Sequence, residues 1–233
     1  MTFLLRTVLF AYLLIAAAGV AAQQTNIIND EIYGSDPLLI NGKYYTFFLP
    51  LNTGGNQFIS GTQFDTGSVI IRGVTYTDLL LNYDIYNQQL ILKYKNNIGA
   101  DNLIILSDAW LEKFSFKGMD FEMISVQDTL KRIFQALGKG TSRILYYWTK
   151  DLKLDSFYGA KNHVFSDARR EMNILTGSQT MRYWNNRSFY SVFGNKRGLA
   201  IKEYMRKRKI NVKRAVDQTM TELIYYCNSL ESR

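Results

Sequence analysis

Short apolar runs rich in β-branched and aromatic residues recur at roughly 8–12-residue intervals through the first half of this chain. The clearest runs cover residues 44–49, 68–71, 75–81, 89–94, 103–106 and 121–124. Gly- and Asn-containing segments separate them, which is typical of antiparallel strands joined by turns. We therefore expect residues 27–125 to form an all-β unit, an antiparallel β-sandwich or partial barrel.

The second half mixes strand and helix patterns. Residues 143–148 predict a strand, and residues 181–192 predict a hairpin that turns at 185–187. Two helices are expected over about 195–208 and 212–230, with Asn211 as the N-cap of the last. Residues 126–138 fit either a helix that begins after a capping box at Ser125, or a strand that turns at Gly138 to Gly140. The predicted fold class is α+β, with β-hairpins and two terminal helices in the C-terminal half.

Charge divides the chain in the same place. Residues 27–125 hold 11 acids and 6 bases, a net charge of −5, whereas residues 126–233 hold 9 acids and 21 bases, a net charge of +12. Such an asymmetry supports two structural units, 27–125 and 126–233, and assigns the positive potential to the second.

The N-terminus predicts export. Residues 1–22 combine Arg6, an apolar stretch and a small-residue end at Ala22, as in a cleavable signal peptide. No later segment is long and apolar enough for a membrane span. We expect a mature chain outside the cytoplasm, periplasmic, at the cell surface or secreted. One Cys and one His leave no disulfide framework and no zinc cluster, so no metal or cofactor is predicted. Cys227 has the spacing of a buried helical residue. His163 lies in a polar stretch and is expected at the surface, because nothing in the chain could complete a metal site around it.

Several short segments are similar to a family of exported bacterial proteins that has no assigned function. They include Tyr76, the run Leu81 to Asp84, the turn Gly138 to Gly140, and the ending Tyr225 to Leu230. The similarity covers most of the chain after residue 22. It implies export and the hairpin interpretation of residues 130–149, and it supplies no catalytic residues.

The strongest charge feature is a basic segment near the C-terminus. Its candidate contact residues are Lys202, Arg206, Lys207, Arg208, Lys209, Lys213 and Arg214. In an exported protein such a segment fits an anionic envelope component or an acidic protein better than nucleic acid, because no base-reading motif accompanies it. The competing interpretation is a solvated face that balances, or docks against, the acidic first unit. Leu199, Ala200, Tyr204 and Met205 are expected to form the buried stripe beneath it.

One motif resembles an active site. Asp65-Thr66-Gly67 matches the turn in which aspartic peptidases hold two carboxylates that share a proton, so a chain with one copy would act as a homodimer. The competing interpretation is that Asp65 caps a turn, Gly67 takes a strained backbone angle and 69–71 begins a strand. From the sequence we expect an exported, non-enzymatic, envelope-associated binding or structural protein, with the aspartic peptidase as the alternative.

Overall fold

The structure, a computed structural model, describes residues 36–96, 98–126, 130–155 and 162–231. The signal peptide predicted over residues 1–22 lies outside these ranges. The elements, with their bounds, are α3 (Pro37–Ile40), β1 (Lys43–Tyr44), β2 (Asp65–Ile71), β3 (Val74–Asp84), β4 (Gln89–Lys95), β5 (Asp101–Ile105), β6 (Leu111–Phe116), β7 (Met119–Val126), β8 (Leu130–Leu137), β9 (Ser142–Thr149), β10 (Leu152–Asp155), β11 (Asn162–Phe165), β12 (Arg169–Thr176), β13 (Gln179–Tyr183), α4 (Asn186–Ser191), α5 (Gly194–Lys207) and α6 (Asp217–Ser229).

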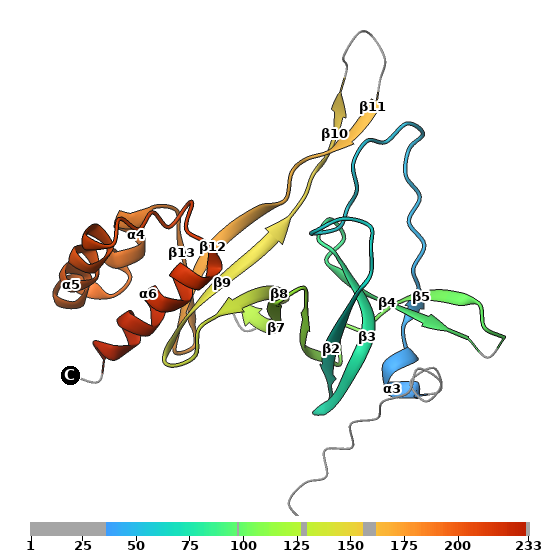
Figure 1. The fold of residues 1–233 in the computed structure, drawn as a ribbon, viewed down its shortest axis with the longest axis horizontal. Helices are drawn as coiled ribbons and strands as arrows, with labels where there is room; N and C mark the ends of the chain where they lie inside the picture. The colour runs from blue at the N-terminus through green and yellow to red at the C-terminus, as the bar shows by residue number, and fades with distance from the viewer. Residues whose placement is uncertain (1–35, 97, 127–129, 156–161, 232–233) are drawn as a thin grey trace, which may run out of the picture.

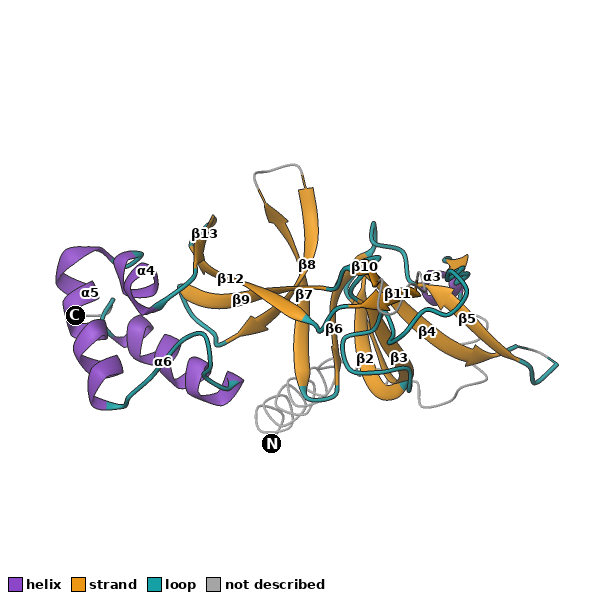
Figure 2. Cartoon of the chain, turned by 90° about the horizontal axis from the view of Figure 1, so that it is seen from above, coloured by secondary structure: helices purple, strands orange, loops and turns teal. Residues whose placement is uncertain are grey.

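Most strands belong to one antiparallel sheet. The 11-stranded sheet has the order β1-β5-β4-β3-β2-β6-β7-β8-β9-β12-β13, and it does not close on itself. Strands β10 and β11 pair separately as a hairpin that projects from the body of the molecule (Figure 1). The helices α4, α5 and α6 lie together at one end, and strands β2 to β5 lie at the other (Figure 2). The predicted α+β class, with an antiparallel N-terminal half and two terminal helices, is confirmed.

Strands β2 to β7 bury apolar side chains on one face, and β4 buries Leu90, Ile91 and Leu92 in succession. The side chains on that one face form a cluster that we call the sheet core. At its centre, Phe114 and Phe121 stack with ring centroids 4.6 Å apart, and Tyr83 meets both rings edge-on. Burial of this kind stabilises by about 25 cal/mol for each Å² of apolar surface removed from water. The sheet core therefore fixes the direction in which every side chain of these strands points.

Residues 130–137 form a strand, which resolves the ambiguity between helix and strand in that region. The hairpin predicted over 181–192 is wrong, because only its first half is a strand. Asn185 does not sit in a hairpin turn. Its side chain accepts a hydrogen bond from the Ser188 N–H at 2.8 Å and caps helix α4, and the Ser188 side chain completes a capping box. Phe189 is fully buried against Tyr183, so tertiary packing overrode its β-propensity.

The two terminal helices are confirmed, but α6 begins at Asp217, later than predicted. Asn211 is not its N-cap; Val216 occupies that position, and the Asn211 carbonyl instead accepts hydrogen bonds from Arg214 and Ala215. The helices pack with β9, β12 and β13 around a second cluster, the helical core. Cys227 is completely buried in it, as its spacing predicted.

Three further outcomes concern the strands. Of the run 44–49, only Tyr44 lies in a strand, because the chain leaves the sheet after the Tyr45 N–H bonds to Leu103. Strand β12 was not among the strands expected from the sequence. The sheet is continuous across the predicted boundary at 125/126, since β7 pairs with β8 over six residue pairs. The two units remain a prediction.

Candidate functional site

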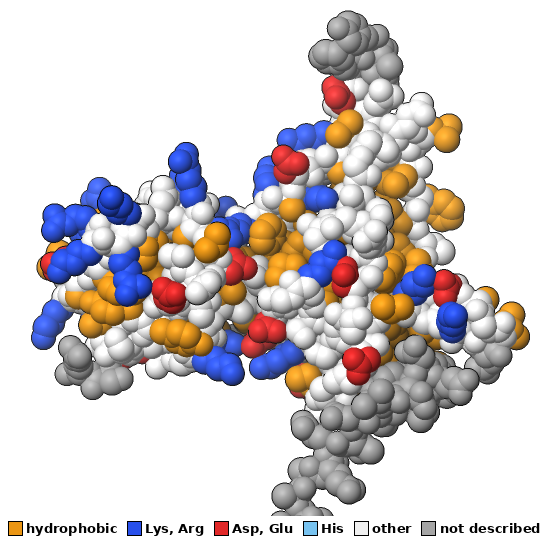
Figure 3. Space-filling model, viewed as in Figure 1, with side chains coloured by type: hydrophobic (Ala, Val, Ile, Leu, Met, Phe, Trp, Pro, Cys, Tyr) orange, Lys and Arg blue, Asp and Glu red, His pale blue; other side chains and the backbone are white. Residues whose placement is uncertain are grey.

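The seven predicted contact residues are all exposed, and together they form what we call the basic surface. Lys202, Arg206 and Lys207 lie on α5, and the others follow it in the connection to α6. Lys and Arg side chains gather over this helical end of the molecule (Figure 3). The buried face of α5 consists of Gly198, Ile201 and Met205. Leu199, which was expected in the buried stripe, is instead 67% exposed.

The basic surface is only partly neutralised. Lys207 pairs with Glu203 at 3.1 Å, and Arg208 pairs with Glu222 at 3.2 Å while its guanidinium lies 4.9 Å from the centroid of the Tyr204 ring. Among the described residues, the remaining cations form no ion pair. Those cations are Lys202, Arg206, Lys209, Lys213 and Arg214. Both acidic partners belong to the helical end, and α5 lies at the opposite end of the molecule from β2 to β5 (Figure 1). The basic surface therefore does not dock against the acidic first half.

The connection between α5 and α6 is held in place. Helix α5 ends in a Schellman motif: the Ile210 N–H donates to the Met205 carbonyl at 2.9 Å, and Lys209 takes a left-handed φ of 52°. The Asn186 side chain then bonds to the chain at two points, donating to the Ile210 carbonyl at 2.7 Å and accepting from the Val212 N–H at 2.9 Å. Lys209 and its basic neighbours are thus presented on a fixed backbone.

Asp65 lies in β2, a strand whose register shifts between Gly67 and Val69 against β3 and between Ile70 and Ile71 against β6. It is the first residue of β2 and pairs with Leu81, so the expected turn cap is wrong. Gly67 also differs from expectation, because it is not among the glycines with positive φ. A Cβ at Gly67 would lie 2.2 Å from the Ser115 carbonyl oxygen, so glycine is required there by the close approach of β6.

The Asp65 carboxylate pairs with Lys117 at 2.7 Å. An aspartic peptidase requires a second carboxylate close enough to share a proton. In the homodimer expected from a chain with one copy of the motif, that second carboxylate would come from another copy of the chain. The peptidase alternative remains a prediction.

The single cysteine is fully buried, whereas the single histidine, expected at the surface, is half-buried. Burial raises the pKa of Cys227 from its ordinary 9.0 to about 12, which keeps the thiol protonated near neutral pH. His163 lies in β11, where its backbone carbonyl accepts a hydrogen bond from Gly54. No group of three or more His, Cys, Asp or Glu residues in the described part of the chain could hold a metal ion.

The motifs quoted for the family resemblance have structural roles. Asp84 is fully buried and accepts hydrogen bonds from Tyr45, from the Asn87 side chain and from two backbone N–H groups of the turn after β3. Asn82 donates to the carbonyls of Gly61 and Gln63. These side chains form hydrogen bonds with backbone N–H and carbonyl groups of loops, which have no partner strand to bond with.

The turn Gly138 to Gly140 and the C-terminal motif meet in space. Asn228 donates to the Lys139 carbonyl and bonds to both backbone groups of Ser142. A Cβ at Gly138 would lie 2.3 Å from the Ile224 Cγ2 atom, so α6 can approach the turn only because glycine is there. Two segments almost ninety residues apart in the sequence are therefore one structural feature.

A groove of about 960 Å³ lies beside this contact, between α6 and the sheet face formed by β2 and β6 to β9. On its floor Glu122 pairs with Arg143 at 2.7 Å and with Lys113 at 3.2 Å. Burial opposes ionisation of Glu122, but these two cations outweigh it and hold its pKa below the ordinary 4.5. No sequence signal identified the groove, because its residues come from separate elements that only the sheet register brings together.

A polar chain of side chains closes the inner side of the groove. The fully buried Gln135 accepts a hydrogen bond from the Trp148 indole N–H at 2.8 Å and donates to Asp217 at 2.6 Å. Trp148 packs against both the sheet core and the helical core. Asp217, at the start of α6, also pairs with Arg170 at 3.3 Å. These contacts fix α6 relative to the sheet.

Comparison of the chain with protein-family models, with curated proteins and with solved structures finds no match. The resemblance to an exported bacterial family therefore remains a prediction from the sequence. No helix among the described residues is long and apolar enough to cross a bilayer.

Proposed function

We propose that this chain is an exported, non-enzymatic binding protein of the bacterial envelope, and that the basic surface is its contact with phosphate-bearing lipid headgroups. One observation supports the proposal above all. Five of the seven cations have no acidic partner in the described ranges, and they lie on a helix and a connection whose backbone is fixed. The predicted leader at residues 1–22 supports export, because it has the features of a signal peptide.

The electrostatics favour an extended anionic surface over a single small anion. The cations are spread along α5 and its C-terminal connection, and none of them lines the 960 Å³ groove beside α6. Each Lys or Arg near an anionic membrane contributes about 1 kcal/mol of attraction, and the attraction falls off within a Debye length. Binding by the basic surface is therefore expected to weaken strongly with salt.

The test is sedimentation with vesicles of phosphatidylcholine, with or without phosphatidylglycerol, at low and at high salt. Arg206→Glu, Lys213→Glu and Arg214→Glu are combined because these three side chains have no ion-pair partner, so their reversal leaves existing pairs intact. The matched control reverses Lys43, Lys95 and Lys131, which are exposed cations outside the basic surface.

We expect the wild-type chain to bind only the anionic vesicles. The triple variant is expected to bind more than about a hundredfold more weakly, and the control within a few fold of wild type. Equal losses in the two variants, or binding that salt does not weaken, would show that the basic surface is not the contact. No vesicle binding together with salt-sensitive binding to polyglutamate would instead identify an acidic protein as the class of partner.

A further inference from the structure

The groove between α6 and the sheet is formed by the sheet face that points away from the sheet core. Along β6 and β7, Phe114 and Phe121 point into the core, whereas their neighbours in sequence point the other way. The register places Ser115 opposite Asp120, and Lys113 opposite Glu122, on this outer face. The Ser68 and Ser115 hydroxyls lie 2.9 Å apart on the same floor. The floor along β6 and β7 is therefore polar, whereas Ile70, Ala136 and Leu137 add apolar lining from β2 and β8.

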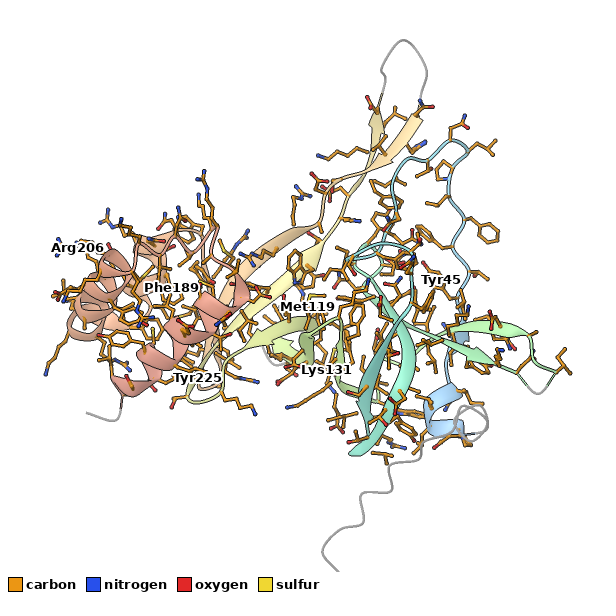
Figure 4. The ribbon with its side chains drawn as sticks, in the orientation of Figure 1. Tyr45, Met119, Lys131, Phe189, Arg206 and Tyr225 are labelled. Atoms are coloured by element: carbon orange, nitrogen blue, oxygen red, sulfur yellow. The ribbon has the colours of Figure 1, made fainter. Side chains whose placement is uncertain are left out.

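Helix α6 forms the opposing wall. Tyr225, Thr221 and Gln218 line the groove from this helix, at the three- and four-residue spacing that places side chains on one helical face. The Tyr225 side chain is 48% exposed, which is high for an aromatic residue on a helix that otherwise buries its apolar side chains. Tyr225 and Met119, which also lines the groove, are labelled in Figure 4.

The charges of the groove cancel. Its charged lining residues are Lys113, Lys139, Arg143, Asp120, Glu122 and Asp217, three cations and three anions. An anionic or cationic ligand would meet like charges as well as opposite ones, which removes the net electrostatic gain of binding. An uncharged ligand with both hydroxyl donors and hydroxyl acceptors would find partners for each. The volume lies near the upper end of the about 300–1,000 Å³ that is usual for small-ligand sites.

We propose that this groove binds an uncharged oligosaccharide. The hydroxyl groups of the sugar would bond to the polar floor, and the apolar face of one ring would lie against Tyr225, since an aromatic ring offers a large apolar surface with a polar tip. None of the basic-surface residues lines the groove, so this site is separate from the proposed lipid contact. The Gly138 to Gly140 turn, held by Asn228, fixes one rim close to Tyr225.

The test is titration calorimetry of the full chain with maltotetraose, cellotetraose and tetra-N-acetylchitotetraose, together with an uncharged Gly-Ser hexapeptide. Tyr225→Ala removes the aromatic face, and Tyr225→Phe keeps it. Tyr44→Ala is the matched control, because Tyr44 is a tyrosine with 68% exposure that does not line the groove. The melting temperature of each variant is measured to confirm that it is folded.

We expect at least one of the three sugars to bind. Tyr225→Ala is then expected to weaken binding about tenfold, with Tyr225→Phe and Tyr44→Ala within about twofold of wild type. Binding to none of the sugars at millimolar concentration, or binding that Tyr225→Ala leaves unchanged, overturns the proposal. Binding of the peptide without the sugars also overturns it, because the groove would then recognise extended polypeptide. Neither result bears on vesicle binding, so the two proposals can fail independently.

Discussion

Asn228 in α6 holds the backbone of Ser142 at two points: its Oδ1 accepts from the Ser142 N–H at 2.9 Å, and its Nδ2 donates to the Ser142 carbonyl at 3.0 Å. The same Nδ2 donates to the Lys139 carbonyl at 3.0 Å. One side chain thus satisfies three backbone groups of the β8–β9 turn, and it joins the last helix to the sheet.

Replacing Asn228 with alanine should therefore destabilise the protein. Three backbone groups would lose their partner, and we expect the free energy of unfolding to fall by about 2–4 kcal/mol. Asn211→Ala is the control, because the Asn211 side chain bonds only to the nearby Lys213 N–H, and it should lower the free energy by less than about 1 kcal/mol. Urea unfolding measures both. Similar losses in the two variants would mean that Asn228 does not join helix to sheet.

The Gly138 position should not accept a Cβ. Gly138 has φ +79°, and an added Cβ would lie 2.3 Å from Ile224 Cγ2. Gly177→Ala is the control, since Gly177 has φ +59° with open space around it, and its cost of about 1–2 kcal/mol reports backbone strain alone. We expect Gly138→Ala to cost about 1–3 kcal/mol more than the control, because the overlap with Ile224 is added.

A double variant separates overlap from strain. Ile224→Ala removes the atom that the new Cβ would meet, so Gly138→Ala with Ile224→Ala should cost less than the sum of the two single changes. Thermal or urea unfolding of the four chains gives the coupling. Strict additivity would contradict a direct contact between the turn and α6.

Variants at Lys209 and Lys207 distinguish the effect of a lost charge from the effect of a changed free energy of unfolding. It holds φ 52° at the end of α5, a conformation that favours glycine, so Lys209→Gly should raise the free energy of unfolding by about 0.5–1 kcal/mol. Lys207→Gly removes a positive charge from the last residue of the helix, together with its ion pair to Glu203, and should lower the free energy of unfolding by about 0.5–1 kcal/mol.

If the basic surface binds anionic lipid, both of these variants should bind anionic vesicles more weakly, by a similar factor. Their stabilities would change in opposite directions while their binding falls together. Loss of binding only in Lys207→Gly would indicate that unfolding of the helix, rather than charge, is responsible.

Glu122 should make stability depend on acid pH. Arg143 and Lys113 outweigh the effect of burial and lower its folded pKa, so its contribution is present above the unfolded value near 4.5 and is lost as pH falls through the folded pKa. Glu122→Gln should therefore be less stable than wild type at pH 7 and should lose less stability below about pH 5.

Glu203→Gln is the control variant for Glu122→Gln. Glu203 also pairs with a lysine, but both side chains are more than half exposed, and solvent screens such pairs. We expect its pH profile to follow that of wild type closely. Parallel acid limbs for wild type and Glu122→Gln would refute the role given to the ion pairs on the groove floor.

The sequence predicts a structural feature well when that feature depends on interactions between residues close together in the chain. Runs such as 75–81 and 89–94 were identified as strands because short β-prone apolar runs and the turn residues between them are local signals. The hairpin predicted over residues 181–192 was wrong because Phe189 is β-prone. Burial of Phe189 against Tyr183 favours the helix instead. Similarly, Gly67 looked like a turn glycine, and only the neighbouring strand β6 shows that close approach is the reason for it.

The sequence by itself determined the α+β class, the buried Cys227, and the concentration of positive charge in the second half, because these follow from composition and from periods of two to four residues. Only the tertiary structure decided that Asp65 pairs with Lys117, that Asn228 holds the turn at Ser142, and that a polar groove lies between α6 and the sheet. The physical reason is sheet register, which brings together residues far apart in sequence and assigns each side chain to one face. A local sequence pattern specifies neither the pairing of distant strands nor the face that results from it.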